Sequence, residues 1–472
     1  MLTTLAAPAF AKEWYIEDGN ITVKASGTEG KNKVSQGNNP EVEDTDTIIT
    51  NQNKDKASSN TVTIDAGNDK VEVTLDNVNI KTDSGSALTS NGDVTLTLKG
   101  ENHLTGGNGD IYGGDGITSR GSLTISGGTV TATGGNNTGS VGSGGSGIYS
   151  VSGDVTISGG TVNANGGDGN FSGGCGIYGS LTVSGGTVNA TGGDGKDGYG
   201  GYGISSNDVA ISGGTVNANG GDSKDGYGGN GISSSSGVAI SGGAVNANGG
   251  DSKNGSGGSG IFSFDRVAIS GGKVAATGGN GKNSNGSDGI RSSVIDLSGS
   301  LELTAKAGSP NGKALSQNGN ELELDTIKDK LGPGAKVTAT DADGKVIDQV
   351  PIPRPVEPEE SSSSSGGGSA APSAPASPLP GLTVTDKDGQ RIFYTSTQSG
   401  NTLTVCVGRL TASFRISLAA LRQLRAEGIE TITFQTILCS TTLSVDELLA
   451  MGGEDAEAVL THRFTDSSLT VG

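Results

Sequence analysis

Carboxylate side chains recur at fixed places in a glycine-rich phrase, where they could bind a hard cation. The phrase reads GGDGKDGYGG from Gly192, GGDSKDGYGG from Gly220 and GGDSKNGSGG from Gly249. If the copies stack, neighbouring strands lie about 4.8 Å apart, and like charges at that distance repel one another. Calcium binds carboxylate and carbonyl oxygens, so it is a candidate cofactor. The candidate ligands form two rows, Asp194, Asp222 and Asp251, and Asp197 with Asp225.

Lysine residues in the same phrases give an alternative explanation. They would stack into a row of their own, made of Lys196, Lys224, Lys253 and Lys282. Their charges can neutralise the carboxylates without a metal ion. The spacing alone leaves both explanations open.

Aromatic side chains recur with the same period and could contact sugar rings. Tyr199 and Tyr227 occupy equal positions in neighbouring copies. Three others follow an isoleucine and are expected to point outward: Tyr149, Tyr178 and Phe262. Rings on a face rich in Asn, Asp and Ser suit the apolar faces and hydroxyls of a sugar polymer. They could equally cover glycine-rich backbone, and rows of Asn could bond along a stack for structural reasons alone.

Catalytic chemistry has little support among the residue types. The two histidines, His103 and His462, lie in different parts of the chain, so neither a histidine-based triad nor a histidine-ligated zinc site is available. A β-elimination lyase needs a cationic base beside acidic calcium ligands. Arg120, Arg266 and Arg291 lie on separate copies without a matching cluster of acids. We therefore predict that the protein is not an enzyme and assign no catalytic residue.

A repeat of about 28 residues carries all these side chains. The triplet Ser-Gly-Gly recurs at intervals of 32, 26, 28, 29 and 29 residues, and a degenerate copy follows 28 residues later. A period of this length is typical of a solenoid. Apolar residues alternate over short runs bounded by glycines, which predicts strands. Three strands can be drawn per repeat, for example at 203–206, 209–212 and 215–219.

Stacking is what allows such a repeat to fold. Three short strands cannot bury their apolar face alone, but identical units stacked along an axis bury one continuous column of Ile and Val. The composition agrees, because 85 glycines, 31% apolar residues and 4% aromatic residues suit a solenoid better than a spherical core. The predicted fold class is therefore all-β, a parallel β-helix with three strands per coil.

Charge and hydropathy exclude several kinds of partner. The formal net charge of −19 argues against nucleic acid and against electrostatic attachment to anionic lipid. After the first residues, nothing approaches the eighteen-residue apolar run of a transmembrane helix. Residues 1–11, MLTTLAAPAFA, resemble the end of a signal peptide, with an ordinary terminus as the alternative. We expect a secreted or cell-surface protein.

The chain divides into four segments by composition. Residues 1–11 are the expected signal peptide remnant, and 12–350 the β-helix with atypical repeats as caps at both ends. Residues 351–381 are a linker rich in Pro, Ser and Gly. Residues 382–472 read as a small α+β domain, with helices beginning at Ser417 and Ser444. Two cysteines of this domain, Cys406 and Cys439, could pair.

The repeat phrases resemble a known family. The passage from Val71 to Leu104, followed by GGDGITSRGSLTISGGTVTATGG from Gly113, is similar to the secreted carbohydrate-binding β-helix domain of clostridia and other gut Firmicutes, a polysaccharide-lyase-like solenoid. The resemblance covers residues 60–318. It implies right-handed coiling, binding of plant or acidic polysaccharides, and calcium bound to the solenoid. The aspartate of the D-G-I phrase is kept at Asp115 and Asp288 but replaced in the coils between them.

The predicted function is non-catalytic polysaccharide binding outside the cell, with calcium as a candidate cofactor and residues 382–472 as a spacer or an attachment to the cell envelope. One alternative is a structural stalk or adhesin that contacts protein. Another is a pectate-lyase-like polysaccharide lyase.

Overall fold

The computed structural model describes residues 12–28, 30–351, 381–385, 391–392, 394–399, 401–407, 411–436, 440–453, 456–463 and 466–472. The chain forms two compact units, Met1–Pro355 and Val356–Gly472. The predicted signal peptide, almost all of the predicted linker and Cys439 lie outside the described residues. The pairing of Cys406 with Cys439 therefore stays a prediction.

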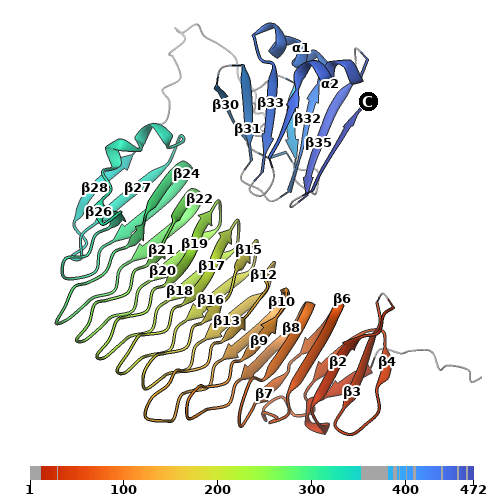
Figure 1. Cartoon of the computed structure of the whole chain (residues 1–472), viewed down its shortest axis with the longest axis vertical. Helices are drawn as coiled ribbons and strands as arrows, with labels where there is room; N and C mark the ends of the chain where they lie inside the picture. The colour runs from red at the N-terminus through yellow and green to blue at the C-terminus, as the bar shows by residue number, and fades with distance from the viewer. Residues whose placement is uncertain are drawn as a thin grey trace, which may run out of the picture. The chain divides into compact units, whose positions relative to one another are not determined.

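The first unit is a parallel β-helix, as the sequence predicts (Figure 1). Its coils contribute to three parallel sheets. Sheet 1 holds the strands that begin at the Ile of Gly-Ile and their counterparts in the end coils, which are β2 (Ile21–Ala25), β9 (Ile117–Arg120), β11 (Ile148–Ser150), β14 (Ile177–Tyr178), β21 (Ile261–Ser263), β23 (Ile290–Ser292) and β25 (Leu315–Gln317). Sheet 2 holds β1 (Lys12–Tyr15), β5 (Thr47–Thr50), β12 (Val155–Ile157) and β15 (Leu181–Val183).

Sheet 3 holds the T-V-N-A-N strands and their counterparts. These are β7 (Asn79–Lys81), β13 (Thr161–Asn165), β16 (Thr187–Thr191), β18 (Thr215–Asn219), β20 (Ala244–Asn248) and β27 (Lys336–Thr340). Longer strands bend from one sheet into the next, namely β6 (Val62–Asp76), β8 (Leu88–Thr105), β10 (Leu123–Thr133), β17 (Ile204–Ile211), β19 (Ile232–Ile240), β22 (Arg266–Thr277) and β24 (Val294–Lys306).

The coils stack in register, so equal residues of neighbouring repeats lie directly above one another. Ile177 pairs with Ile204, and Ile204 pairs with Ile232. These isoleucines are fully buried, as are the Val and Ala of sheet 3. The inner column of Ile and Val is confirmed, and the residue after each isoleucine must face outward because side chains alternate along a strand.

Backbone hydrogen bonds also order the long glycine arms between sheet 3 and the next sheet 1 strand. Gly221 N donates to Gly201 O of the preceding coil at 2.8 Å. Gly229 N donates to Gly221 O at 2.9 Å, across the two sides of the same arm. A Cβ on Gly221 would lie 2.0 Å from the carbonyl oxygen of Gly193. The glycines are therefore required by close packing of backbone, and the arms are fixed rather than loose.

Antiparallel hairpins close both ends of the solenoid. At the first end, β3 (Asn32–Gln36) and β4 (Val42–Asp44) add to β2, and at the other end β26 (Asn320–Glu321) and β28 (Val346–Pro351) pair with β25 and β27. The 3-10 turns η1 (Ile16–Asp18), η2 (Leu324–Thr326) and η3 (Lys328–Lys330) complete the caps. Trp14 is buried in the first cap, and its Nε1 donates to Asp44 at 2.7 Å.

In the residues that the structure describes, the second unit has two four-stranded sheets and two helices. One sheet has the order β29 (Leu382–Thr385), β32 (Thr411–Ser417), β35 (Glu457–Arg463) and β36 (Asp466–Val471). The other has β30 (Thr395–Ser399), β31 (Thr402–Cys406), β33 (Thr431–Gln435) and β34 (Ser440–Ser444). Helices α1 (Leu418–Ala426) and α2 (Val445–Met451) begin after Ser417 and Ser444, whose side chains accept hydrogen bonds from the first turn, as predicted.

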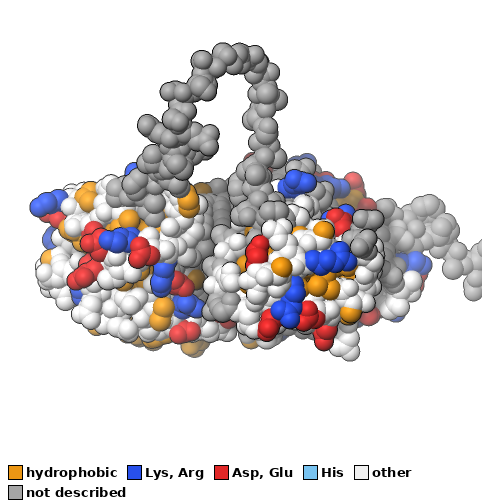
Figure 2. Space-filling view, turned by 90° about the horizontal axis from the view of Figure 1, so that it is seen from above, with side chains coloured by type: hydrophobic (Ala, Val, Ile, Leu, Met, Phe, Trp, Pro, Cys, Tyr) orange, Lys and Arg blue, Asp and Glu red, His pale blue; other side chains and the backbone are white. Residues whose placement is uncertain are grey.

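Surface charge is mixed in sign. Seen from above, acidic and basic side chains are interspersed on the visible face (Figure 2). Within the described parts of the chain, no helix is long and apolar enough to cross a membrane.

Candidate functional site

A single row of side chains crosses the outer face of sheet 1. Each member is the residue after the buried isoleucine, and the register aligns Thr118, Tyr149, Tyr178, Ser205, Ser233, Phe262 and Arg291. Aromatic rings therefore stand at two places in the row, and two serines separate them. Tyr178 and Phe262 are three coils apart, which is about 14 Å at the spacing of stacked strands.

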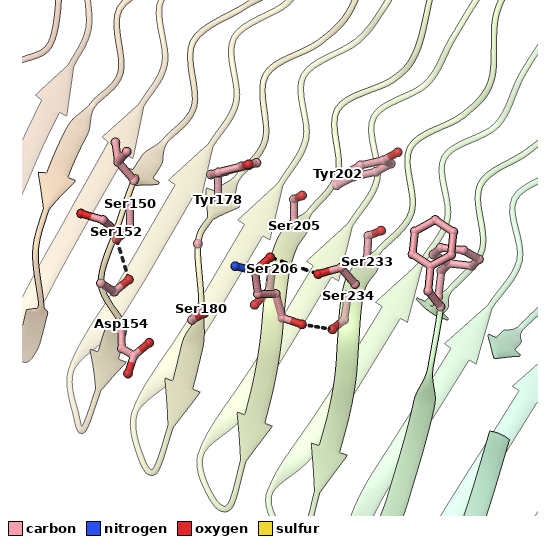
Figure 3. A pocket seen from close by; sticks show the side chains of 17 residues that line it. Ser150, Ser152, Asp154, Tyr178, Ser180, Tyr202, Ser205, Ser206, Ser233 and Ser234 are labelled. Carbon is pink, nitrogen blue, oxygen red and sulfur yellow. Dashed lines mark hydrogen bonds between the residues drawn. The ribbon is translucent and has the colours of Figure 1, made fainter. Parts of the chain in front are cut away.

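The gap between these rings opens into a groove of about 570 Å³, which we call the serine groove (Figure 3). Its lining is rich in hydroxyl groups, with four aromatic side chains and one amide. It is formed by Ser150, Val151, Ser152, Gly153, Asp154, Tyr178, Gly179, Ser180, Tyr202, Ser205, Ser206, Asn207, Ser233, Ser234, Ser235, Phe262 and Phe264.

Turn lengths between sheets 1 and 2 shape the groove. The turn after β14 has only two residues, Gly179 and Ser180, whereas four residues, 151–154, separate β11 from β12. Val151, in the longer turn, is 55% exposed, and Phe264, in the two-residue turn between β21 and β22, is 68% exposed. Both side chains line the groove, so the turns between sheets 1 and 2 form its outer side.

Serine hydroxyls on the floor are oriented by the backbone. Ser234 Oγ donates to the carbonyl oxygens of Asn207 at 2.6 Å and Gly237 at 2.8 Å. Ser150 Oγ donates in the same way to Gly153 O at 2.8 Å. Ser234 Oγ also accepts the backbone N–H of Gly237 at 3.0 Å, and both Ser234 and Ser150 are buried, so these hydroxyls hold the turns beneath the groove. The half-buried Ser205 and Ser233 carry the hydroxyls that a ligand can reach in this row.

The first aromatic pair, Tyr149 and Tyr178, is stacked with ring centroids 4.9 Å apart and planes 25° apart. Burial raises the pKa of Tyr149. Tyr178 remains 41% exposed, because the next position in the row is Ser205 and the ring has no aromatic neighbour on that side. Its free side is therefore open to a ligand in the groove.

Phe262 stands at the other end of the gap. Phe264 contacts it edge to face with centroids 4.8 Å apart, and the guanidinium carbon of Arg291 lies 5.9 Å from the centroid of Phe262. Because Arg291 belongs to the following coil, it lies on the side of the ring away from Ser233.

The five predicted sugar-binding rings thus lie in two separate places. Tyr149, Tyr178 and Phe262 belong to the sheet 1 row, and Tyr178 and Phe262 line the groove. Tyr199 and Tyr227 lie on the glycine arms, stacked with centroids 5.5 Å apart and planes 14° apart. Their exposed fractions are 48% and 53%. Earlier arms carry further exposed apolar side chains that the sequence analysis did not single out: Ile111, Tyr112, Val141 and Phe171.

The sequence analysis also missed most of the groove. Tyr202, Phe264, Asp154 and the eight serines were not proposed as site residues. Serines are common throughout the chain, so their number does not mark a site. Alignment of the repeats could have found it, because Ser205 and Ser233 occupy the position that Tyr or Phe takes in neighbouring repeats.

The first row of acids has a structural role in the stack. The Oδ1 atom of each aspartate accepts the backbone N–H of its counterpart in the next coil, with Asp194 bonded to Asp222 N at 2.9 Å and Asp222 bonded to Asp251 N at 2.8 Å. Asparagine makes the same bond elsewhere in the row, from Asn136 to the amide of Asp168 at 2.9 Å. We call this row the Asx ladder. Its continuity does not depend on charge.

The second row is held by amides and by one lysine. Asn254 Nδ2 donates to Asp225 Oδ1 at 2.6 Å, and Lys224 Nζ lies 3.0 Å from Asp225 Oδ2. Both oxygens of Asp225 therefore have partners, and these partners lower its pKa. Asp197 lies on the preceding arm, where its backbone N–H donates to Asn170 O at 3.1 Å.

These rows fit a calcium ion poorly. Calcium takes six to eight oxygens from several directions, but in the Asx ladder one carboxylate oxygen of each aspartate is already bonded to the neighbouring coil. In the described parts of the chain no three acidic, histidine or cysteine side chains come together as a metal site. The aspartates of the D-G-I phrase are also engaged, since Asp115 Oδ1 accepts Ser146 N and Asp288 Oδ1 accepts Lys313 N, both at 2.8 Å.

The cationic side chains named for a lyase lie apart from these acids. Arg266 bonds Asp296 at 2.8 Å, and Arg291 packs near Phe262. Cys175, in the position before Gly-Ile, is half-buried, and desolvation of its thiol raises the pKa to about 11, so the thiol resists ionisation.

A family model described as a beta helix repeat matches residues 123–147, 155–177, 181–208 and 209–236. Seven of the seventeen residues that line the serine groove lie in these segments, and the match agrees with the parallel β-helix fold. No curated protein and no solved structure matches the chain.

Proposed function

We propose that the β-helix binds a polysaccharide, without chemical conversion, in the serine groove. The observation that carries this proposal is the interrupted row of sheet 1, in which the exposed ring of Tyr178 and the half-buried ring of Phe262 bracket two serines. Sugars present apolar ring faces and a rim of hydroxyls. Stacking on aromatic rings and hydrogen bonds to oriented hydroxyls match both features.

Export to the cell surface is part of the same proposal. A surface glycan is reached only by an exported protein, and the short apolar N-terminal run agrees with export. Residues 382–472 would then serve as a spacer or as attachment to the cell envelope. Glycan binding in this groove would not use calcium as a bridge, because the candidate acids lie outside the groove lining.

A glycan array with the full chain, in calcium and in a chelator, tests this function. We expect binding of at least one polysaccharide in both conditions, with loss in Tyr178→Ser and retention in Tyr227→Ser. Retention in Tyr178→Ser with loss in Tyr227→Ser would place the site on the arms. An array without any bound glycan would favour the structural stalk. Release of unsaturated uronate products that absorb in the ultraviolet would identify a lyase.

A further inference from the structure

We infer that the serine groove selects uncharged glycans and rejects polyuronates, an inference that depends on the proposed function. The protein is acidic overall, and a uronate bound in the groove would interact with the charged residues around it. Asp154 is the one charged residue among the residues that line it, and the lining contains neither Lys nor Arg. Asp208 and Asp265 directly follow the lining residues Asn207 and Phe264.

Two arginines near the groove are engaged or displaced from it. Arg266 is bonded to Asp296, and Arg291 lies over the side of Phe262 that faces the following coil. Arg120 ends β9, one coil beyond the lining residues Ser150 and Val151. A carboxylate held by the lining residues would therefore meet Asp154 without a cationic partner, and proteins hold carboxylates with Arg, Lys or a metal. The acids that could share a metal lie on the glycine arms.

The polar groups that do line the floor suit neutral hydroxyls. Serine hydroxyls and the Asn207 amide both donate and accept hydrogen bonds. Ser205 and Ser233 lie on consecutive coils, about 4.8 Å apart, which is close to the advance of one sugar residue in an extended β-1,4-linked chain. The side chains of Ser205 and Ser233, on neighbouring strands, point the same way in Figure 3. Each coil can therefore offer the same kind of contact to successive sugars.

Binding measured by calorimetry with chains of equal length tests the inference. The probes are hexasaccharides of β-1,4-glucan, β-1,4-mannan and galacturonate, each in a chelator and in calcium. We expect at least one neutral hexasaccharide to bind at least tenfold more tightly than hexagalacturonate. Asp154→Lys is expected to raise the ratio of uronate to neutral affinity at least tenfold.

A filling variant tests whether the groove is the site. Ser205→Tyr would place a ring at a position where β11 and β14 already carry tyrosine, so the melting temperature is expected to stay within about two degrees while neutral binding falls at least tenfold. If melting changes, Ser233→Tyr repeats the test one coil away. Equal or tighter binding of hexagalacturonate, or neutral binding that survives both fillings, would overturn the inference and leave glycan binding standing. Failure of every saccharide to bind would overturn the proposed function as well.

Discussion

Tyr178 and Ser205 are neighbours in the parallel register of sheet 1, so a stacked pair of tyrosine rings ends where a serine begins. This single change of side-chain volume opens the serine groove. The repeated backbone gives sheet 1 a flat outer face. A groove forms where one position of the repeat changes from tyrosine to serine. The glycan-binding proposal depends on this interruption.

Removing the ring that borders the gap should weaken glycan binding more than it weakens the fold. In Tyr178→Ala the stacked partner is lost, and aromatic pairs contribute about 1 kcal/mol. We expect the free energy of unfolding to fall by roughly that amount, and glycan affinity to fall about tenfold, which corresponds to about 1.4 kcal/mol. Calorimetry and chemical unfolding measure the two quantities. Tyr149→Ala is the matched control for stacking, because Tyr149 does not line the groove.

The Asx ladder allows charge to be separated from hydrogen bonding. Asp222→Asn keeps the bond to Asp251 N, as Asn136 does elsewhere, and removes repulsion from Asp194 and Asp251. Asp222→Ala loses the bond, and a hydrogen bond of this kind contributes about 0.5–1.5 kcal/mol. We therefore expect Asp222→Asn to unfold at an equal or higher denaturant concentration than the wild type, and Asp222→Ala at a lower one. A loss in Asp222→Asn as large as that in Asp222→Ala would show that the negative charge itself is required.

The same ladder predicts a pH dependence. Burial, together with the charges of Asp194 and Asp251, raises the pKa of Asp222. The Asp222 carboxyl therefore keeps its proton to a higher pH in the folded protein than in the unfolded chain. Its protonation contributes fully to folding stability below a pH of about 4, and this contribution is lost as the pH rises through the pKa of the folded state. Between pH 4 and pH 7 the unfolding midpoint of the wild type should fall relative to that of Asp222→Asn. Parallel curves for the two proteins would contradict this.

Much of the fold could be predicted because the solenoid is specified locally. Ile204 and its counterparts recur in phase and all lie inside, so periodicity was sufficient to place the inner column. Ser417 and Ser444 cap helices where their sequence context predicts caps. Strands β32, β34, β35 and β36 were not predicted, because no repeat marks them.

The site was less predictable because it depends on differences between repeats. Sequence reasoning looked for conspicuous residue types and found Tyr199 and Asp222, which repeat regularly and stack on their own copies. The groove arises instead where the repeat is broken, at Ser205 and at the short Gly179–Ser180 turn. The regular hydrogen bonding of the glycine arms was also not predicted, because a run of glycines has no side-chain pattern that indicates which backbone carbonyls pack against it.

The second glycine of each Ser-Gly-Gly triplet, where the chain turns between two sheets, should not tolerate a side chain. Gly214 has φ +74°, and a Cβ there would lie 2.6 Å from the carbonyl oxygen of Gly186 in the preceding coil. We expect Gly214→Ala to lower the free energy of unfolding by about 2 kcal/mol, because both the strained φ and the overlap must be accommodated. Gly237→Ala is the control within the same region, since its Cβ would meet its nearest atom at 3.7 Å. Equal stability of the two variants would contradict this prediction, because it would show that the backbone at Gly214 moves to accommodate a Cβ.

The second unit should lose stability in mild acid through His462. This histidine is fully buried, its Nε2 lies 3.0 Å from Thr441 Oγ1, and its Nδ1 has no partner. Burial lowers its pKa. The unfolded chain therefore binds the proton at a higher pH, and stability is retained above a pH of about 6.5 and lost as the pH falls further. His462→Gln should remove this dependence between pH 7 and pH 5, as followed by thermal unfolding of the full chain.

Calcium should change the stability of the β-helix very little. Each aspartate of the Asx ladder already uses Oδ1 to accept the next coil's amide, and Lys224 together with Asn254 engages both oxygens of Asp225. A ligand that binds the folded state at a hundred times its dissociation constant would add about 2.7 kcal/mol to stability. We expect instead that 5 mM calcium, a concentration of the order that saturates weak extracellular sites, moves the melting temperature by less than about one degree. A larger rise that disappears in the triple variant Asp194→Asn, Asp222→Asn, Asp251→Asn would locate a calcium site on the ladder, because that variant keeps the hydrogen bonds and removes only the charges.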